Sequence, residues 1–270
     1  MSTIPDPAEL LALCEDLART AGEHARARTA DHGGVARTKS SAVDVVTAVD
    51  EEVEALLRAR LAELRPDDGV LGEEEGSVEG TSGLTWVVDP IDGTVNFLYG
   101  IPAYSISVAV VSGSADPLTW TAEAGCVHAV ALGTTWTAAR GLGAWRDGER
   151  LGPRPAPPLA RALVGTGFGY TVEERTLEGA LVAKILPQVR DIRRLGSAAI
   201  DLCLVADGRL DAYYEIGLNP WDMAAGSLVV AEAGGAVQGL TGGPASPAMT
   251  IAGGPGLVGE LAAALRAAGA

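Results

Sequence analysis

A proline-rich run at residues 153–158, with the sequence Pro-Arg-Pro-Ala-Pro-Pro, is the feature that most constrains how this chain can fold. Proline fixes φ and lacks a backbone N–H, so neither a helix nor a central strand can run through this segment. We therefore expect the chain to cross here between two structural units. The predicted N-terminal unit spans residues 1–152, and the predicted C-terminal unit spans residues 153–270.

The hydrophobic pattern before the proline-rich run predicts an α+β unit. Asp6-Pro7 is typical of a helix start, and apolar residues with helical spacing follow it. A second helix is predicted from Thr47 to about residue 64. Short runs rich in Val, Ile and Thr predict a largely antiparallel sheet, with strands over 85–88, 105–111, 119–127 and 134–138. Asp147-Gly148 then predicts a β-hairpin turn.

After the proline-rich run, strand-like and helix-like segments alternate, which predicts an α/β unit. The expected strands cover residues 162–165, 191–193, 211–215 and 250–252, with one more near 236. The expected helices cover residues 172–190, 197–206, 221–233 and 257–268.

Composition limits the classes of function. The chain has 270 residues, 47% of them hydrophobic, and a formal net charge of −15. Such an acidic chain is poorly suited to binding nucleic acid or an anionic membrane, so we expect neither as a partner. It has no run of about 18 apolar residues and no secretory signal, so we expect a cytoplasmic protein. An anionic substrate would need a bound metal ion to reverse the local field.

Cysteine and histidine do not form a recognisable site in the sequence. The spacing of Cys14, Cys126 and Cys203 gives neither a disulfide framework nor a zinc ribbon, so we expect buried thiols. His24, His32 and His128 lie far apart, and none belongs to an H-x-x-x-H pattern.

Acidic residues beside turns are the strongest chemical signal. The segment 86–94 reads Trp-Val-Val-Asp-Pro-Ile-Asp-Gly-Thr. It predicts a buried strand that ends at Asp89, because Pro90 cannot continue a central strand. Asp92 follows three residues later, across a turn that Gly93 permits, and Thr94 can cap a following helix. The two carboxylates can therefore converge on one point, and the amides of Gly93 and Thr94 can hold a phosphate.

Two further acidic segments accompany this one. Residues 72–76 read Gly-Glu-Glu-Glu-Gly, and Asp222 follows Asn219-Pro220-Trp221 at the start of a predicted helix. Each segment alone also fits an ordinary role, as a solvated charge cluster or a favourable helix N-terminal acid. Asp89 and Asp92 alone could likewise be only cap and turn residues. Their occurrence together and in this order favours a functional site.

Together these motifs resemble those of the inositol monophosphatase family, in its bacterial form, within the lithium-sensitive, magnesium-dependent phosphatase superfamily. The matching segments are 39–41, 44–50, 72–74, 86–97, 194–199, 211–215, 221–226 and 232–235. The resemblance implies a five-layer α/β/α/β/α sandwich of the inositol monophosphatase and fructose-1,6-bisphosphatase type. It also implies a homodimer, with most metal ligands in the N-terminal unit and the C-terminal unit completing the site.

The resemblance implies a metal site for two to three Mg²⁺ ions. One ion would be held by Glu73, Asp89 and the carbonyl of Ile91. A second would be held by Asp89, Asp92 and Asp222, and a third, weaker ion by Glu73 and water. Magnesium prefers oxygen ligands of these kinds.

The resemblance also assigns catalytic and substrate-binding roles. Thr94 with Asp50 would orient the attacking water, Glu73 would be a further catalytic residue, and the Gly93 and Thr94 amides would bind phosphate. The residues expected to meet the substrate hydroxyls are Asp92, Ser197, Ala198, Glu215 and Asp222.

The implied activity is magnesium-dependent hydrolysis of myo-inositol monophosphate to myo-inositol and phosphate, so the expected partner is a small phosphorylated polyol. Glu215 favours inositol phosphates among the family's substrates. Fructose-1,6-bisphosphate, histidinol phosphate, 3′-phosphoadenosine 5′-phosphate and NADP remain alternatives, because relatives with the same motifs act on them. A non-enzymatic regulatory binding module on the same fold is a further alternative.

Overall fold

The structure is a computed structural model that describes residues 5–29, 35–39 and 44–270. His32, Ser40 and Ser41, which enter the sequence interpretation above, lie outside the described residues. Within the part of the chain that is described, no helix is both long and apolar enough to cross a membrane.

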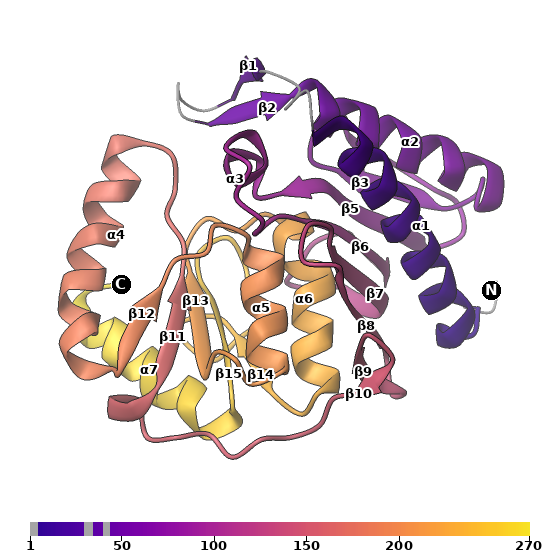
Figure 1. Cartoon of the computed structure of the whole chain (residues 1–270). Helices are drawn as coiled ribbons and strands as arrows, with labels where there is room; N and C mark the ends of the chain where they lie inside the picture. Colours follow the sequence, from indigo (N-terminus) through magenta and orange to yellow (C-terminus); the bar gives the residue numbers. More distant parts are fainter. Residues whose placement is uncertain (1–4, 30–34, 40–43) are drawn as a thin grey trace.

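The N-terminal half builds an eight-stranded sheet in the order β10-β9-β8-β7-β6-β5-β3-β4 (Figure 1). Every neighbouring pair is antiparallel except β3 and β5, which run parallel. The strands are β3 (Gly69–Gly72), β4 (Gly76–Val78), β5 (Leu84–Asp92), β6 (Ser105–Ser112), β7 (Thr121–Ala129), β8 (Thr134–Ala139), β9 (Gly143–Arg146) and β10 (Glu149–Arg150).

Two helices, α1 (Pro7–Arg28) and α2 (Ala48–Leu64), cover one face of this sheet. The predicted start of α1 is confirmed, because the Asp6 carboxylate accepts a hydrogen bond from the Ala8 N–H at 2.9 Å. Its apolar stripe, which includes Leu10 and Leu17, is buried against the sheet together with Val53 and Leu57 of α2.

The C-terminal half builds a five-stranded sheet in the order β12-β11-β13-β15-β14. The first three strands are parallel, and β15 runs antiparallel to both of its neighbours. The strands are β11 (Leu163–Thr166), β12 (Asp191–Arg193), β13 (Ala212–Glu215), β14 (Ala236–Gln238) and β15 (Thr250–Gly253).

Helices α5 (Ala198–Ala206) and α6 (Pro220–Glu232) form the layer between the two sheets, and α4 (Val172–Ile185) and α7 (Pro255–Ala268) form the outer layer (Figure 1). Three buried clusters separate these layers. The predicted five-layer α/β/α/β/α sandwich is therefore confirmed. In the layer between the sheets, α6 packs closely on β7. A Cβ at Gly125 of β7 would be only 2.9 Å from the Ala225 Cα of α6, so glycine allows this approach.

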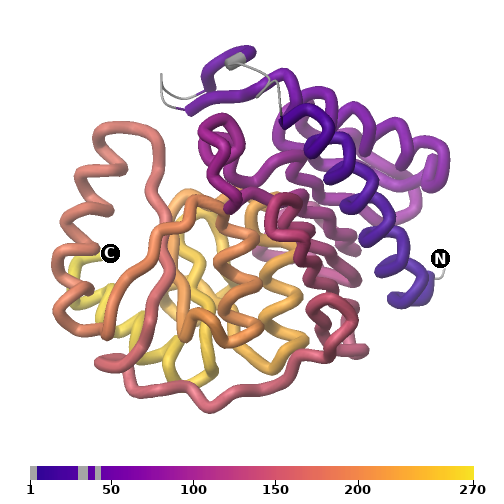
Figure 2. The backbone as a smooth tube through the Cα atoms, viewed as in Figure 1, coloured from indigo at the N-terminus to yellow at the C-terminus, as the bar shows by residue number. Residues whose placement is uncertain are grey.

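The proline-rich run forms the connection between the sheets, along the lower edge of the molecule in Figure 2. It lies against glycines of the C-terminal half. A Cβ at Gly234 would be 2.6 Å from the Pro153 ring, and a Cβ at Gly254 would be 2.6 Å from the Ala156 side chain.

Several local predictions are wrong. β5 continues through Pro90 to Asp92, and its pairing with β6 changes register between Asp89 and Asp92, so the strand does not end at Asp89. The helix predicted over 172–190 ends at Ile185 and is followed by a 3-10 turn, Leu186–Gln188, which contains a proline. The strand predicted over 119–127 begins and ends two residues later.

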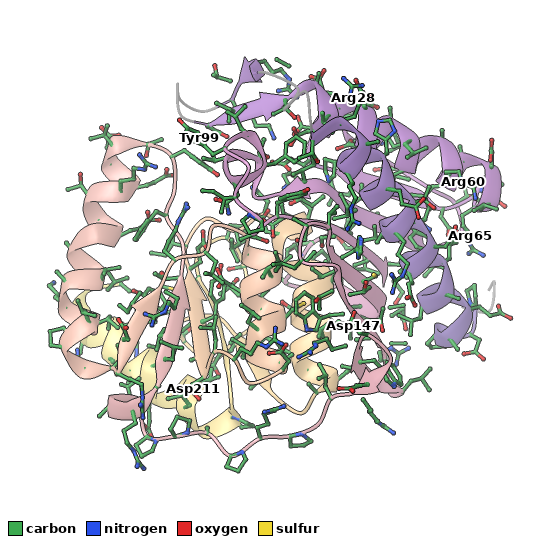
Figure 3. The ribbon with its side chains drawn as sticks, in the orientation of Figure 1. Arg28, Arg60, Arg65, Tyr99, Asp147 and Asp211 are labelled. Carbon is green, nitrogen blue, oxygen red and sulfur yellow. The ribbon has the colours of Figure 1, made fainter. Side chains whose placement is uncertain are left out.

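The short helix α3 (Thr94–Leu98) also begins differently from the prediction, because Gly93 rather than Thr94 occupies the cap position. Gly93 has φ 97°, and a Cβ there would lie 2.9 Å from the Ala103 carbonyl oxygen. Glycine is therefore required both by the left-handed backbone and by the lack of space. Tyr99, just after α3, is 75% exposed and projects outward from the ribbon (Figure 3).

Candidate active site

A polar cavity of about 350 Å³ lies where the two halves of the chain meet. The N-terminal half contributes Lys39, Glu73, Asp89, Ile91, Asp92, Gly93 and Thr94. The C-terminal half contributes a glycine-rich turn at 167–169, Tyr170, Arg194, Ser197, Ala198, Glu215 and Asp222. All the predicted site residues except Asp50 therefore line one cavity.

The acids of the N-terminal half come from two neighbouring parallel strands. Gly72 at the end of β3 is paired with Val88 of β5, so Glu73 and Asp89 follow at the same edge of the sheet. Asp92 ends β5 beyond the change of register. Because parallel strands carry their carboxyl ends to one edge, three acids separated in sequence meet there.

Asp222 of α6 completes the acidic cluster. Carboxylate oxygens of Asp89, Asp92 and Asp222 lie within 4.8 Å of one another. Asp89 Oδ1 is buried and has no hydrogen-bond partner among the described residues. Burial and mutual repulsion raise the pKa values of Asp89 and Asp222 well above their ordinary range. A bound cation would relieve this repulsion, so the cluster fits a metal ion.

The C-terminal half holds Asp92 in place. Ser197 Oγ donates to Asp92 Oδ2 at 2.6 Å, and the Ala199 N–H donates to the same oxygen at 2.8 Å. The Ala198 N–H donates to Asp92 Oδ1 at 3.2 Å. Burial raises the pKa of Asp92 to about 6, and these donors oppose that rise. The polar atoms of Ser197 and Ala198, predicted to meet substrate, thus contact Asp92 in this structure.

Thr94 and Asp50 form the predicted pair. The Thr94 hydroxyl lies 2.9 Å from Asp50 Oδ1 and 3.1 Å from the Ile91 carbonyl oxygen. The other oxygen, Asp50 Oδ2, accepts from the Thr47 N–H at 2.9 Å and from the Thr47 hydroxyl, as part of the capping box that begins α2. Burial raises the pKa of Asp50 to about 6.

Comparison with known proteins identifies the family. A sequence model described as the inositol monophosphatase family matches residues 6–269. The chain belongs to the inositol monophosphatase family.

Relatives of the chain include inositol-1-monophosphatase SuhB of Mycobacterium tuberculosis, which is 47% identical over 98% of this chain and 96% of its own length. The structure of Mycobacterium tuberculosis SuhB superposes with a TM-score of 0.83, covering 98% of this chain and 99% of that one at 45% identity. The Nus factor SuhB of Escherichia coli is 40% identical over 74% of this chain and 73% of its own length.

A solved structure with a bound substrate-like molecule is also similar. Staphylococcus aureus inositol monophosphatase-II with inositol monophosphate bound has a TM-score of 0.78 at 27% identity, covering 94% of this chain and 92% of that one. Family membership and these relatives make the chain a phosphatase, with a small phosphorylated molecule as substrate.

In this inositol monophosphatase family member, contacts that the sequence did not reveal support Glu73. Lys39 Nζ donates to Glu73 Oε1 and to Glu74 Oε1, both at 2.7 Å. Burial raises the pKa of Glu73 to about 7, and Lys39 opposes that rise. As a lone lysine, Lys39 had the pattern of a surface charge, and only its place in a family motif suggested more.

Glu54 of α2 stabilises the turn that carries Glu73. The Glu54 carboxylate accepts the N–H groups of Glu74 at 2.7 Å and Glu75 at 2.9 Å. A Cβ at Gly72 would lie within 3.0 Å of that carboxylate, so glycine provides the space. An acid on a helix carries no local signal of such a contact, and the sequence interpretation therefore missed Glu54.

Proposed function

We propose that the chain hydrolyses myo-inositol monophosphate to myo-inositol and phosphate with two to three Mg²⁺ ions. The observation that carries the proposal is the convergence of Asp89, Asp92 and Asp222 within 4.8 Å, beside the hydrogen-bonded Thr94 and Asp50. A relative named inositol-1-monophosphatase and a similar structure with inositol monophosphate bound support the choice of substrate.

The proposed metal ligands are oxygen atoms that suit Mg²⁺. Glu73, Asp89 and the Ile91 carbonyl would hold one ion, and Asp89, Asp92 and Asp222 a second. Glu73 and water would hold a third. Bound Mg²⁺ supplies positive charge that offsets the anionic phosphoryl group and makes water more acidic. The orphaned Asp89 Oδ1 supports this assignment, since a buried carboxylate oxygen needs a partner.

The proposed role of Thr94 and Asp50 is to hold the attacking water. The Thr94 hydroxyl has a single proton, and Asp50 Oδ1 accepts it when the Ile91 carbonyl faces a cation. The lone pairs of Thr94 Oγ1 are then free to accept a hydrogen bond from water. The backbone amides of Gly93 and Thr94 would bind the phosphate.

The substrate hydroxyls would meet Asp92, Ser197, Ala198, Glu215 and Asp222, which line the same cavity. The alternative substrates have one observation in their favour. The Arg194 guanidinium lies 5.8 Å from the centre of the Phe168 ring, and both residues line the cavity. A cation and an aromatic face in this wall could accept a second phosphate or a base.

A regulatory role is the other alternative, because some relatives are named Nus factor SuhB. All the proposed metal ligands are present here, and we therefore propose catalysis. We also propose a homodimer, on the strength of the family resemblance.

Phosphate release with and without Mg²⁺ tests the proposal. The panel holds myo-inositol 1-phosphate, fructose-1,6-bisphosphate, histidinol phosphate, 3′-phosphoadenosine 5′-phosphate and NADP. We expect the largest kcat/KM for myo-inositol 1-phosphate and no release without Mg²⁺. A larger value for another compound would replace the substrate, and release from none of them would favour the regulatory role.

Lithium inhibition belongs to the same proposal. Li⁺ is small and hard, so it suits the oxygens of Asp89, Asp92 and Asp222, but it carries only one charge. We expect Li⁺ to bind after hydrolysis, so inhibition should strengthen at saturating substrate. Relief of inhibition by excess substrate would contradict this order of binding.

A further inference from the structure

The glycine-rich sequence at 165–167, at the end of β11, lies next to Glu215 at the end of β13. β11 and β13 are parallel neighbours, with Gly165 opposite Tyr213 and Thr166 opposite Tyr214. Because side chains alternate along a strand, Gly165 and Gly167 share a face with Tyr213 and Glu215. Tyr213 belongs to the buried cluster that includes α5 and α6, so this face points toward the middle layer.

Gly167 provides the space that the Glu215 carboxylate occupies. A Cβ at position 167 would lie within 3.0 Å of the Glu215 Cδ and of both its carboxylate oxygens. Gly167 does not have a left-handed φ, so space rather than backbone conformation requires glycine. Any side chain at this position would displace the carboxylate.

Tyr213 fixes the direction of the same carboxylate. Its ring is fully buried, a Cβ at Gly165 would lie 3.1 Å from the ring, and its hydroxyl donates to Glu215 Oε2. This bond engages one of the two carboxylate oxygens of Glu215, and Glu215 also lines the cavity. Asp92, Arg194 and Glu178 act electrostatically on Glu215, and Glu215 in turn raises the pKa values of Asp201 and Asp222.

We propose that Gly167 and Tyr213 are positioning residues that hold Glu215 to select polyol phosphates over phosphate esters without ring hydroxyls. The inference rests on the proposed function, in which Glu215 meets a substrate hydroxyl. A buried carboxylate held toward the cavity is left without a donor when the substrate lacks that hydroxyl. Selectivity then depends on residues that act through the position of Glu215.

The test compares two substrates, myo-inositol 1-phosphate and p-nitrophenyl phosphate, in Mg²⁺. Gly167→Ala and Tyr213→Phe should each lower kcat/KM for the inositol ester about 10–100-fold, mainly through KM, the range for a lost hydrogen bond to a charged group. Activity on p-nitrophenyl phosphate should fall much less. Tyr213→Phe keeps the ring and decides the question if Gly167→Ala fails to fold.

Matched controls and a double variant sharpen the test. Gly152→Ala adds a methyl group where no atom of the described residues lies within 4 Å, and Tyr214→Phe removes a hydroxyl from the opposite face of the same strand as Tyr213. Both should behave as wild type on both substrates. The double variant Gly167→Ala/Glu215→Gln should be no worse than Glu215→Gln, because Gly167 acts through Glu215.

The outcomes separate this inference from the proposed function. A wild-type protein that does not prefer myo-inositol 1-phosphate to p-nitrophenyl phosphate overturns the proposed substrate and the inference together. A wild-type protein with that preference, but with variants that lose both activities equally or with additive losses in the double variant, overturns the inference alone.

Discussion

The two sheets contribute to the same cavity in different ways. The eight-stranded sheet supplies charge, because Glu73, Asp89 and Asp92 follow from two adjacent parallel strands at one edge. The five-stranded sheet and its helices supply mainly fixation, since Ser197 and two amides bind Asp92 and Tyr213 binds Glu215. Asp222, Glu215 and Arg194 are exceptions, because they bring charge to the cavity from the C-terminal half. The comparison indicates that the N-terminal half gathers most of the repelling acids, and that the C-terminal half fixes one of them, Asp92, by hydrogen bonds.

The sharpest way to break this comparison is to remove a charge from the N-terminal half. Asp92→Asn should keep the fold but lower kcat roughly 10³-fold, since it removes a charge from the proposed metal pocket. Steady-state kinetics and circular dichroism measure the two parts. Glu75→Gln, an exposed acid of the same turn as Glu73, is the control and should leave kcat unchanged. Wild-type rates in Asp92→Asn would refute the two-metal assignment.

Thr94 tests whether the N-terminal half also orients water. Thr94→Ala should lower kcat about 10²-fold with little change in KM, because the contact is made mainly in the transition state. Thr94→Ser retains the hydroxyl and should retain most of the activity. If Thr94→Ala keeps its full kcat, Thr94 has only a structural role at the start of α3.

Ser197 tests the fixing role of the C-terminal half. Ser197→Ala removes the donor at 2.6 Å from Asp92 but no proposed metal ligand. We expect about a tenfold higher Mg²⁺ concentration for half-maximal activity, at the lower end of the usual effect of groups that orient ligands. Ser246→Ala, in a surface turn far along the chain, serves as control. An unchanged Mg²⁺ requirement would mean that Asp92 does not need the C-terminal half.

The smallest expected effect concerns stability. Asp201 of α5 is buried, and its Oδ1 has no hydrogen-bond partner among the described residues. Burial, then the charges of Glu215 and Asp92, raise the pKa of Asp201 well above its ordinary value. An acid whose pKa is raised on folding destabilises the folded protein as pH rises above the unfolded pKa. The free energy of unfolding of Asp201→Asn, taken relative to that of wild type, should therefore be larger at pH 8 than at pH 5.

Urea unfolding at pH 5 and pH 8 measures that gain. Glu63→Gln, an exposed acid of α2, should show no such pH-dependent difference from wild type. A constant difference between Asp201→Asn and wild type at the two pH values would show that Asp201 is not a buried acid of this kind.

Much of the fold could be predicted because its signals are local. The cap at Asp6 and the apolar stripe of α1 lie within one segment, as do the Val-rich strands. The path through Pro90 could not be predicted, because it depends on β6. Asp89 pairs with Ser107 and Asp92 with Ser105, so three residues of β5 advance against two of β6. Such a bulge accommodates a residue without an N–H.

The candidate site shows the same limit. Its acids could be identified from sequence motifs. The hydrogen bonds from the Glu74 N–H to Glu54 and from Ser197 to Asp92 could not, because each joins residues far apart in the sequence and no local pattern predicts such a contact. The division at residues 152 and 153, and the role of each site residue, stay predictions.

The close fit of α6 on β7 has a consequence for synthesis on the ribosome. The strands of the eight-stranded sheet are complete at Arg150, but α6, which lies across β5 to β9, ends only at Glu232. At translation rates of about 5–20 residues per second, the roughly 80 intervening residues take about 4–16 s to add. For that interval the nascent sheet displays an apolar face without α6, and for most of it without α5. Chaperones that shield emerging chains should therefore engage this protein between the two points, and rare codons in that stretch would lengthen its exposure.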